Sequence, residues 1–181
     1  MTDLPPAYLE PDPNDPPVHT LRIEREFDAP RALVWRAWTE PAMLGAWFGP
    51  HGFSCPTCNV ELRPGGPYRI VMRGPDGVDY PIIGQVLEVR PPERLVMSVL
   101  LDEHPAAFHA ALAQERGAGG PARPLTWEIT LEDLGPRTRV TVVNRFGDAT
   151  ERDIHVKVGA YDGWSQSFEK LDRVLDERST A

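Results

Sequence analysis

The sequence predicts an α+β domain in which a curved antiparallel sheet wraps around one long C-terminal helix. Apolar and polar residues alternate with period two in several segments, as in strands with one buried face. Tight proline- and glycine-containing turns join these segments, which indicates an antiparallel meander rather than βαβ units. Residues 161–175 carry one apolar stripe at helical spacing. We expect a largely apolar cavity between sheet and helix, because a strongly curved sheet does not close fully onto a straight helix.

The composition is that of a globular protein with an acidic surface. The 181 residues fit one domain, with 41% apolar and 25% charged residues. The net charge of −8 disfavours nucleic acids and anionic lipids as partners. The sequence has no apolar run long enough to insert in a membrane, and no apolar run near its start that would indicate a secretory signal. A cytoplasmic location is therefore expected.

The first part of the chain is predicted to be a tail, a strand and two short helices. Residues 1–18 are rich in proline, which removes hydrogen-bond donors and favours an extended tail. The domain is expected to span residues 19–178. Residues 19–27 alternate as a strand, and Pro30 suits the first turn of a helix that Pro41 ends. A second short helix is expected from Pro41 to Trp47, before Gly49 and Pro50 break it.

The middle of the chain is predicted to be the meander. Strands are expected at residues 60–62, 68–73, 80–89 and 95–101, with turns at 64–67 and 75–77. Residues 102–123 interrupt the pattern as an insertion with a short helix over 105–116 and a flexible link from Gly117. Strands resume at 125–131 and 138–146. The long helix follows, with its stripe at Tyr161, Trp164, Phe168, Leu171 and Leu175.

Several motifs make the sequence resemble a known family. Residues 27–35 (FDAPRALVW) and 47–50 (WFGP) resemble its first strand, first helix and tryptophan-containing turn. Residues 62–66, 91–95 and 163–167 resemble its double-glycine hairpin, a strand connector and the start of its last helix. The chain is similar, over about residues 19–177, to the START-like, helix-grip proteins, and among them to the homologues of the activator of heat-shock protein 90 ATPase. The resemblance implies a helix-grip fold with an internal ligand cavity. Relatives include co-chaperones, lipid and hormone binders, and cyclases.

Large and polar residues on the inward faces are the candidate ligand-binding set. Inward rings and thioethers favour an aromatic-walled pocket, and a few inward polar groups would orient the ligand. Arg25 requires an acidic partner, an exit to solvent at a sheet end, or an anionic ligand group, because an unpaired buried charge is costly. The predicted set consists of Arg25, Trp47, Tyr68, Met72, Tyr80, Gln85, Met97, Trp127, Asn144, Phe146, Tyr161, Trp164 and Phe168.

The sequence predicts no metal, cofactor or catalytic residue. Cys55 and Cys58, with His51 upstream, have a spacing that zinc or redox sites use, but a closed zinc site needs a fourth ligand and a redox motif needs a βαβ context. In an extended segment the two cysteines would point to opposite faces. The five histidines are scattered, and His104 and His109 lie in the insertion.

Three functions remain open from the sequence. Binding of a small hydrophobic or amphipathic molecule is the leading hypothesis. An enzyme of cyclase, dehydratase or hydrolase type on the same scaffold would need an acid or base inside the cavity. A stress-related chaperone-cofactor role rests on the family name alone, as an analogy. A homodimer formed through a strand edge or the insertion is a further possibility.

Overall fold

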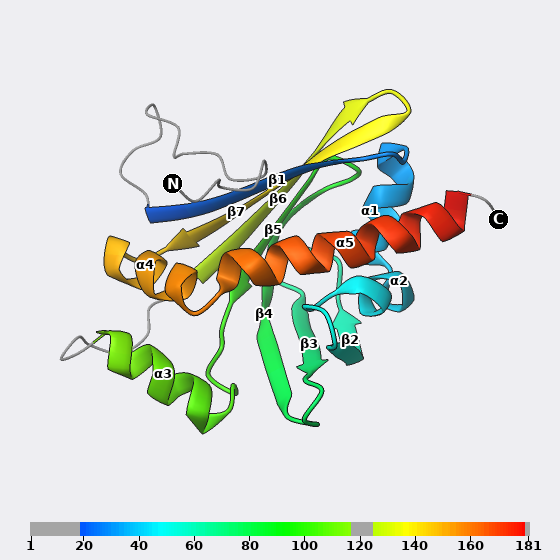
Figure 1. Ribbon diagram of the computed structural model, residues 1–181. Coiled ribbons are helices and arrows are strands. Elements are labelled where there is room, and N and C mark those ends of the chain that lie inside the picture. Colours follow the sequence, from blue (N-terminus) through cyan, green and yellow to red (C-terminus); the bar gives the residue numbers. More distant parts are fainter. Residues whose placement is uncertain (1–18, 117–124, 180–181) are drawn as a thin grey trace, which may run out of the picture.

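The computed structural model describes residues 19–116 and 125–179, and it has a seven-stranded antiparallel sheet packed against helices (Figure 1). The strand order is β1-β7-β6-β5-β4-β3-β2. The strands are β1 (His19–Phe27), β2 (Ser54–Val60), β3 (Pro67–Arg73), β4 (Asp79–Arg90), β5 (Arg94–Val99), β6 (Leu125–Leu134) and β7 (Arg137–Phe146). The helices are α1 (Arg31–Thr39), α2 (Pro41–Trp47), α3 (Ala106–Arg116), α4 (Ala149–Lys157) and α5 (Ala160–Ser179). The predicted fold class is therefore confirmed.

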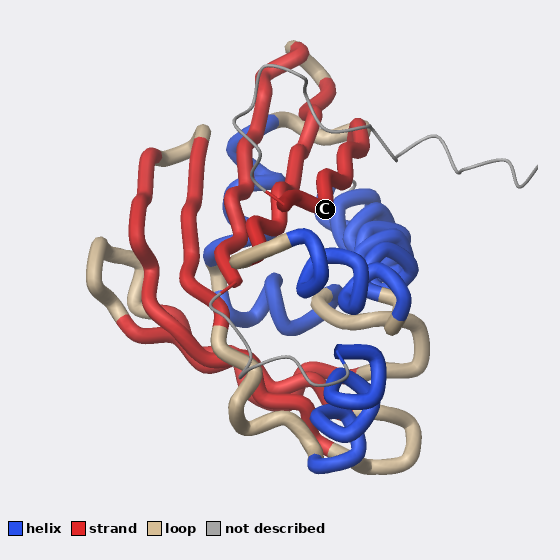
Figure 2. The backbone as a smooth tube through the Cα atoms, turned by 90° about the vertical axis from the view of Figure 1, so that its left-hand side faces the viewer, coloured by secondary structure: helices blue, strands red, loops and turns tan. Residues whose placement is uncertain are grey.

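The sheet is curved, and the long helix α5 lies along its concave side (Figure 1 and Figure 2). Strands β6 and β7 pair without interruption from Thr126–Arg145 to Leu134–Arg137, and β1 extends this half along β7. In the other half, the pairing register shifts in β4 between Val86 and Glu88. Gly84 allows a close approach there, because a Cβ at this position would lie 2.0 Å from the carbonyl oxygen of Ser98.

Helix α5 supplies the centre of the core. Its stripe residues Trp164, Phe168, Leu171 and Leu175 are all buried. The ring of Phe168 lies 5.5 Å from that of Phe27, between centroids, and contacts the indoles of α1 and α2 as well. The predicted packing of the long helix against the sheet is confirmed, and the aromatic half of the stripe also contacts the two short helices.

The structure differs from the prediction at two elements. The strand expected at residues 60–62 is instead β2, Ser54–Val60, because residues 61–66 turn back, with the amide of Gly66 donating to the carbonyl of Arg63. Helix α4 was not predicted, since its apolar periodicity is weak and only Glu151 and Ile154 are buried. Its start is stabilised by the side chain of Asp148, which accepts a hydrogen bond from the amide of Glu151.

Other expectations fall outside these elements. The proline-rich tail at 1–18 and the link at 117–124 lie outside the described residues. The short helix expected in the insertion is present as α3. In the part of the chain that the structure describes, no helix is both long enough and apolar enough to cross a membrane.

Candidate functional site

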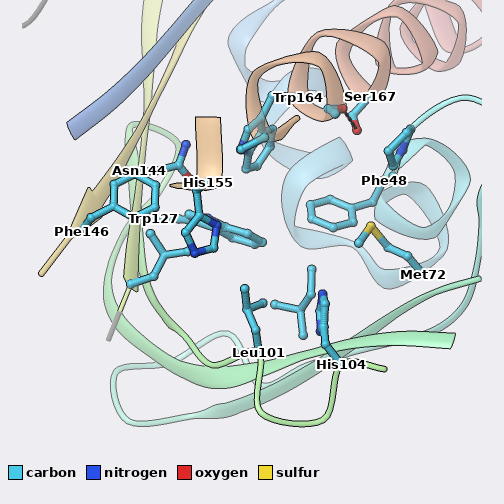
Figure 3. A pocket seen from close by; sticks show the side chains of 16 residues that line it. Phe48, Met72, Leu101, His104, Trp127, Asn144, Phe146, His155, Trp164 and Ser167 are labelled. Atoms are coloured by element: carbon cyan, nitrogen blue, oxygen red, sulfur yellow. Dashed lines mark hydrogen bonds between the residues drawn. The ribbon is translucent and has the colours of Figure 1, made fainter. Parts of the chain in front are cut away.

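A cavity of about 170 Å³ lies between the sheet and the first turns of α5 (Figure 3). Strands β3, β4, β6 and β7 form one wall, and α5 forms the opposite wall. The segment after α2, the segment after β5 and helix α4 complete the lining. The lining residues are Phe48, Gly49, Pro50, Met72, Ile82, Leu101, His104, Leu125, Trp127, Asn144, Phe146, His155, Ala160, Gly163, Trp164 and Ser167.

Three aromatic rings pack against one another in the cavity wall. The indole of Trp127 lies 5.2 Å from that of Trp164, between centroids, in a T-shaped arrangement. The ring of Phe48 lies 5.8 Å from Trp127 and 5.9 Å from Trp164. Trp164 packs edge to face on both other rings, and Phe48 and Trp127 are tilted by 47° to each other, so the three rings form a rigid surface for an apolar ligand.

His104 brings a neutral imidazole to the cavity from the segment after β5. Its Nδ1 lies 2.8 Å from the carbonyl oxygen of Pro81, and since a carbonyl can only accept, Nδ1 carries the proton. Burial lowers the pKa of His104 to about 4. At neutral pH its Nε2 is therefore an unprotonated hydrogen-bond acceptor.

His155 lines the same cavity from α4 and is also neutral. Burial lowers its pKa, Glu151 one turn earlier offsets part of this effect, and Arg116 adds to it. Glu151 and Arg116 form a buried two-point ion pair between α4 and α3, with nitrogen–oxygen distances of 2.6 and 3.0 Å. The two charges compensate each other behind the cavity wall.

Asn144 is the most unusual polar group in the wall. Its side chain is buried, with 2% of the residue exposed, and its Nδ2 donates to no group in the described parts of the chain. A buried donor without a partner costs about 1–3 kcal/mol. The hydroxyl of Ser167, by contrast, donates to the carbonyl of Gly163 at 2.7 Å. The cavity therefore combines apolar walls with one unused donor and carries no formal charge on its lining side chains.

Comparisons with known proteins identify the family. The model of the family described as Activator of Hsp90 ATPase homolog 1-like protein matches residues 28–176. The chain belongs to this family. The resemblance seen in the motifs is thereby confirmed.

Solved structures agree with this assignment. A protein from Nitrosomonas europaea is 30% identical, with a TM-score of 0.75, over 92% of this chain and 99% of that chain. A protein from Chromobacterium violaceum is 27% identical, with a TM-score of 0.65, over 87% and 96%. The AHSA1 protein from Silicibacter pomeroyi is 26% identical, with a TM-score of 0.63, over 88% and 99%. No curated protein matches this sequence.

In this member of the Hsp90-activator-like family, part of the predicted ligand set lines the cavity. These residues are Met72, Trp127, Asn144, Phe146 and Trp164. They come from β3, β6, β7 and α5. Although these residues lie up to 92 positions apart in the sequence, the fold brings them together around the cavity.

Other predicted residues lie outside the cavity lining. Trp47, Met97 and Phe168 are buried in the core, and the indole nitrogen of Trp47 donates to the carbonyl of Ala37 at 2.9 Å. Tyr68 is also buried, and its hydroxyl donates to the carbonyl of Ser98 at 2.7 Å.

Tyr80 and Tyr161 are only partly buried. Tyr80 packs on the rings of Phe53 and His104, so it supports a lining residue from behind.

The two remaining polar predictions have different outcomes. Arg25 is half-buried and pairs with Asp172 on α5, so of the three expected alternatives it has the acidic partner. Burial raises the pKa of Asp172, and the charge of Arg25 offsets part of that effect. The expectation that Gln85 points inward is wrong, because it is exposed while Ile82 and Val86 of the same strand are buried. The inward parity of β4 is thus the opposite of the one assumed.

The sequence reasoning missed both cavity histidines. His104 lies in the insertion and His155 in the unpredicted helix α4, and neither has a sequence signal that places it inside. Ser167 could have been found, because it stands three residues after Trp164 and so shares its helical face.

The cysteine pair lies away from the cavity, in a surface groove between β2 and α2. The expectation that Cys55 and Cys58 point to opposite faces is wrong, since the pairing register shifts between Ser54 and Thr57 and both cysteines line this groove. A hydrogen bond from the Cys58 thiol lowers the pKa of Cys55, and the same contact raises that of Cys58.

His51 does not join the cysteines. Its Nε2 lies 3.1 Å from the carboxylate of Glu169 on α5. Within residues 19–116 and 125–179, no three His, Cys, Asp or Glu side chains come together in a way that could hold a metal ion.

Proposed function

We propose that the protein binds a small hydrophobic or amphipathic molecule in the cavity between the sheet and α5. The buried amide of Asn144 carries this proposal, because an unused donor in the wall of an apolar cavity is a cost that a ligand acceptor would remove. The rigid aromatic wall supplies the apolar contact area. Family membership supports the proposal, since the fold is compatible with an internal ligand.

Native mass spectrometry of the gently purified protein is the first test. A small molecule that stays with the folded chain and is released on denaturation would support the proposal. Intrinsic tryptophan fluorescence provides the second readout, since two of the five tryptophans, Trp127 and Trp164, line the cavity.

A cavity-filling variant makes the test specific. Gly163 faces the cavity from α5, and a Cβ there would meet only Pro50 Cγ, at 3.7 Å. Gly163→Leu should therefore fold, gain helix propensity and lose binding. Arg173→Leu adds the same side chain on an exposed position of α5 and is the matched control. Equal binding by wild type, Gly163→Leu and Arg173→Leu would contradict the proposed site.

An enzyme on the same scaffold is the second candidate, because two neutral imidazoles face the cavity. The unprotonated Nε2 of His104 has the protonation state of a general base at neutral pH. A reaction of cyclase, dehydratase or hydrolase type would show as a mass or absorbance change in a bound compound. Unchanged turnover in His104→Phe would contradict a catalytic role for this residue.

Location and chaperone activity are separate proposals. We propose a cytoplasmic location because two cysteines do not make a disulfide framework. The chaperone-cofactor alternative rests on the family's name, and an ATPase assay with a purified heat-shock protein 90 would test it.

A further inference from the structure

We propose that the cavity selects an uncharged, single-ring aromatic molecule that carries a hydrogen-bond acceptor at one end and a hydroxyl group at the other. The compound 4-hydroxyacetophenone represents this class. The inference rests on the proposed binding function and adds the chemistry of the ligand.

The size of the cavity matches about one ring. Its volume of about 170 Å³ is small, since pockets for drug-sized ligands typically measure ~300–1,000 Å³. An apolar cavity of ~150 Å³ holds a benzene molecule. A benzene ring with two small substituents is therefore the scale that fills the cavity, and an acyl chain or a multi-ring body would extend out through its opening.

The walls favour a flat ring. Phe48, Trp127 and Trp164 are held by packing against one another and present faces and edges to the cavity (Figure 3). A ligand ring can add to this cluster in the same offset or edge-to-face geometry, which aromatic pairs prefer.

The acceptor end of the ligand is assigned to Asn144. Its Nδ2 is buried without a partner in the described part of the protein, at the side of the cavity where His155 also lies (Figure 3). A carbonyl oxygen on the ligand would satisfy this donor after the amide turns toward the cavity, because Nδ2 itself has less than 1 Å² of accessible surface. A purely apolar ligand would leave it unsatisfied and would bind less tightly.

The hydroxyl end is assigned to His104, on the other side of the cavity (Figure 3). The hydrogen bond from Nδ1 to Pro81 fixes the tautomer and leaves Nε2 as an acceptor. The ring is also held in place by Phe108, whose centroid lies 4.5 Å away. A ligand hydroxyl can donate to this nitrogen, whereas a methyl group cannot.

The lining excludes charged ligands. Among the described residues, no Lys, Arg, Asp or Glu side chain lines the cavity. Two charged side chains outside the lining have partners of their own: Arg116 pairs with Glu151, and the amine of Lys170 donates to the carbonyls of Gly49 and Phe53, each at 3.0 Å. A ligand carboxylate would lose its hydration without gaining a counter-charge.

A set of near-isosteric compounds tests the assignment by calorimetry on the full chain. 4-Hydroxyacetophenone should bind best. 4-Ethylphenol, which lacks the acceptor, and 4-methylacetophenone, which lacks the hydroxyl, should each bind roughly tenfold more weakly. 4-Ethyltoluene should bind more weakly still, and 4-hydroxybenzoate should not bind measurably.

Two variants assign the ends. Asn144→Leu should reduce the affinity for 4-hydroxyacetophenone to that for 4-ethylphenol and leave 4-ethylphenol unchanged. His104→Phe keeps the aromatic contacts and should remove the preference for the hydroxyl in the same way. Circular dichroism of both variants confirms folding before binding is measured.

The outcomes separate the two proposals. If 4-ethyltoluene binds as tightly as 4-hydroxyacetophenone, or 4-hydroxybenzoate binds as well, the ligand class is wrong while binding in the cavity stands. If no compound of the set binds but native mass spectrometry finds another bound molecule, the ligand class is again overturned alone. If neither experiment finds a bound molecule, both proposals are overturned.

Discussion

Replacing Asn144 by leucine should stabilise the protein at the expense of ligand recognition. The Nδ2 of Asn144 is buried and unpartnered among the described residues, and an unsatisfied donor of this kind costs about 1–3 kcal/mol. Leucine has a similar volume and no polar atom, and repacking of similar volumes typically costs under about 1.5 kcal/mol. The net expectation for Asn144→Leu is a gain of about 1 kcal/mol in the free energy of unfolding.

Urea unfolding followed by circular dichroism measures this gain, and thermal unfolding should show a rise of roughly 2–4 °C in Tm. Ser167→Ala is the matched control, because its hydroxyl is already hydrogen bonded to Gly163 and its removal releases no unsatisfied group. If Asn144→Leu lowers the free energy of unfolding by more than about 1 kcal/mol, the amide has a partner in the folded protein and the prediction is wrong. Stability gained together with binding lost is the pattern of a residue kept for function.

Three further predictions follow from the cavity, the ion pair and the cysteine groove. The pKa of His104 is lowered from 6.5 to about 4, so between these pH values the unfolded chain takes up a proton that the folded chain does not. The free energy of unfolding should therefore fall by up to ~3 kcal/mol as the pH drops through this window. Urea unfolding at several pH values checks this, and His104→Phe should flatten the plot of stability against pH. Glu151→Gln leaves Arg116 without its counter-charge in a buried position and should lower the free energy of unfolding by about 3 kcal/mol. Replacing both Arg116 and Glu151 by methionine should restore most of this stability. Equal losses in the single and the double variant would contradict the prediction. Iodoacetamide should alkylate Cys55 before Cys58, because the contact between the two thiols lowers the pKa of Cys55 and raises that of Cys58. Mass analysis of peptides at timed intervals measures the two rates, and equal rates would refute the prediction.

Local patterns in the sequence were sufficient for most of the fold. The apolar stripe of α5 and the alternation in residues 125–146 have the periods of a helix and of strands, and the structure has those elements at those places. Periodicity does not fix the end of a strand where a turn decides it. Strand β2, for example, ends at Val60, before the turn that contains Gly66.

The site was only partly predictable. Trp127, Asn144 and Trp164 were found because inward parity on β6 and β7 and one helical face on α5 follow from short-range periodicity. Gln85 was misplaced, because Gly84 occupies an inward position of β4 without contributing an apolar side chain, so the parity of that strand is ambiguous in the sequence.

The sequence by itself determined the α+β class, the long covering helix and the apolar character of the space beneath it. Only the tertiary structure decided which polar groups face that space. His104 and His155 come from irregular or weakly periodic segments, and their protonation depends on burial and on the carbonyl of Pro81, which lies 23 residues from His104. Periodicity reports the direction of a side chain relative to its own element, whereas a cavity is defined by elements that meet from distant parts of the chain.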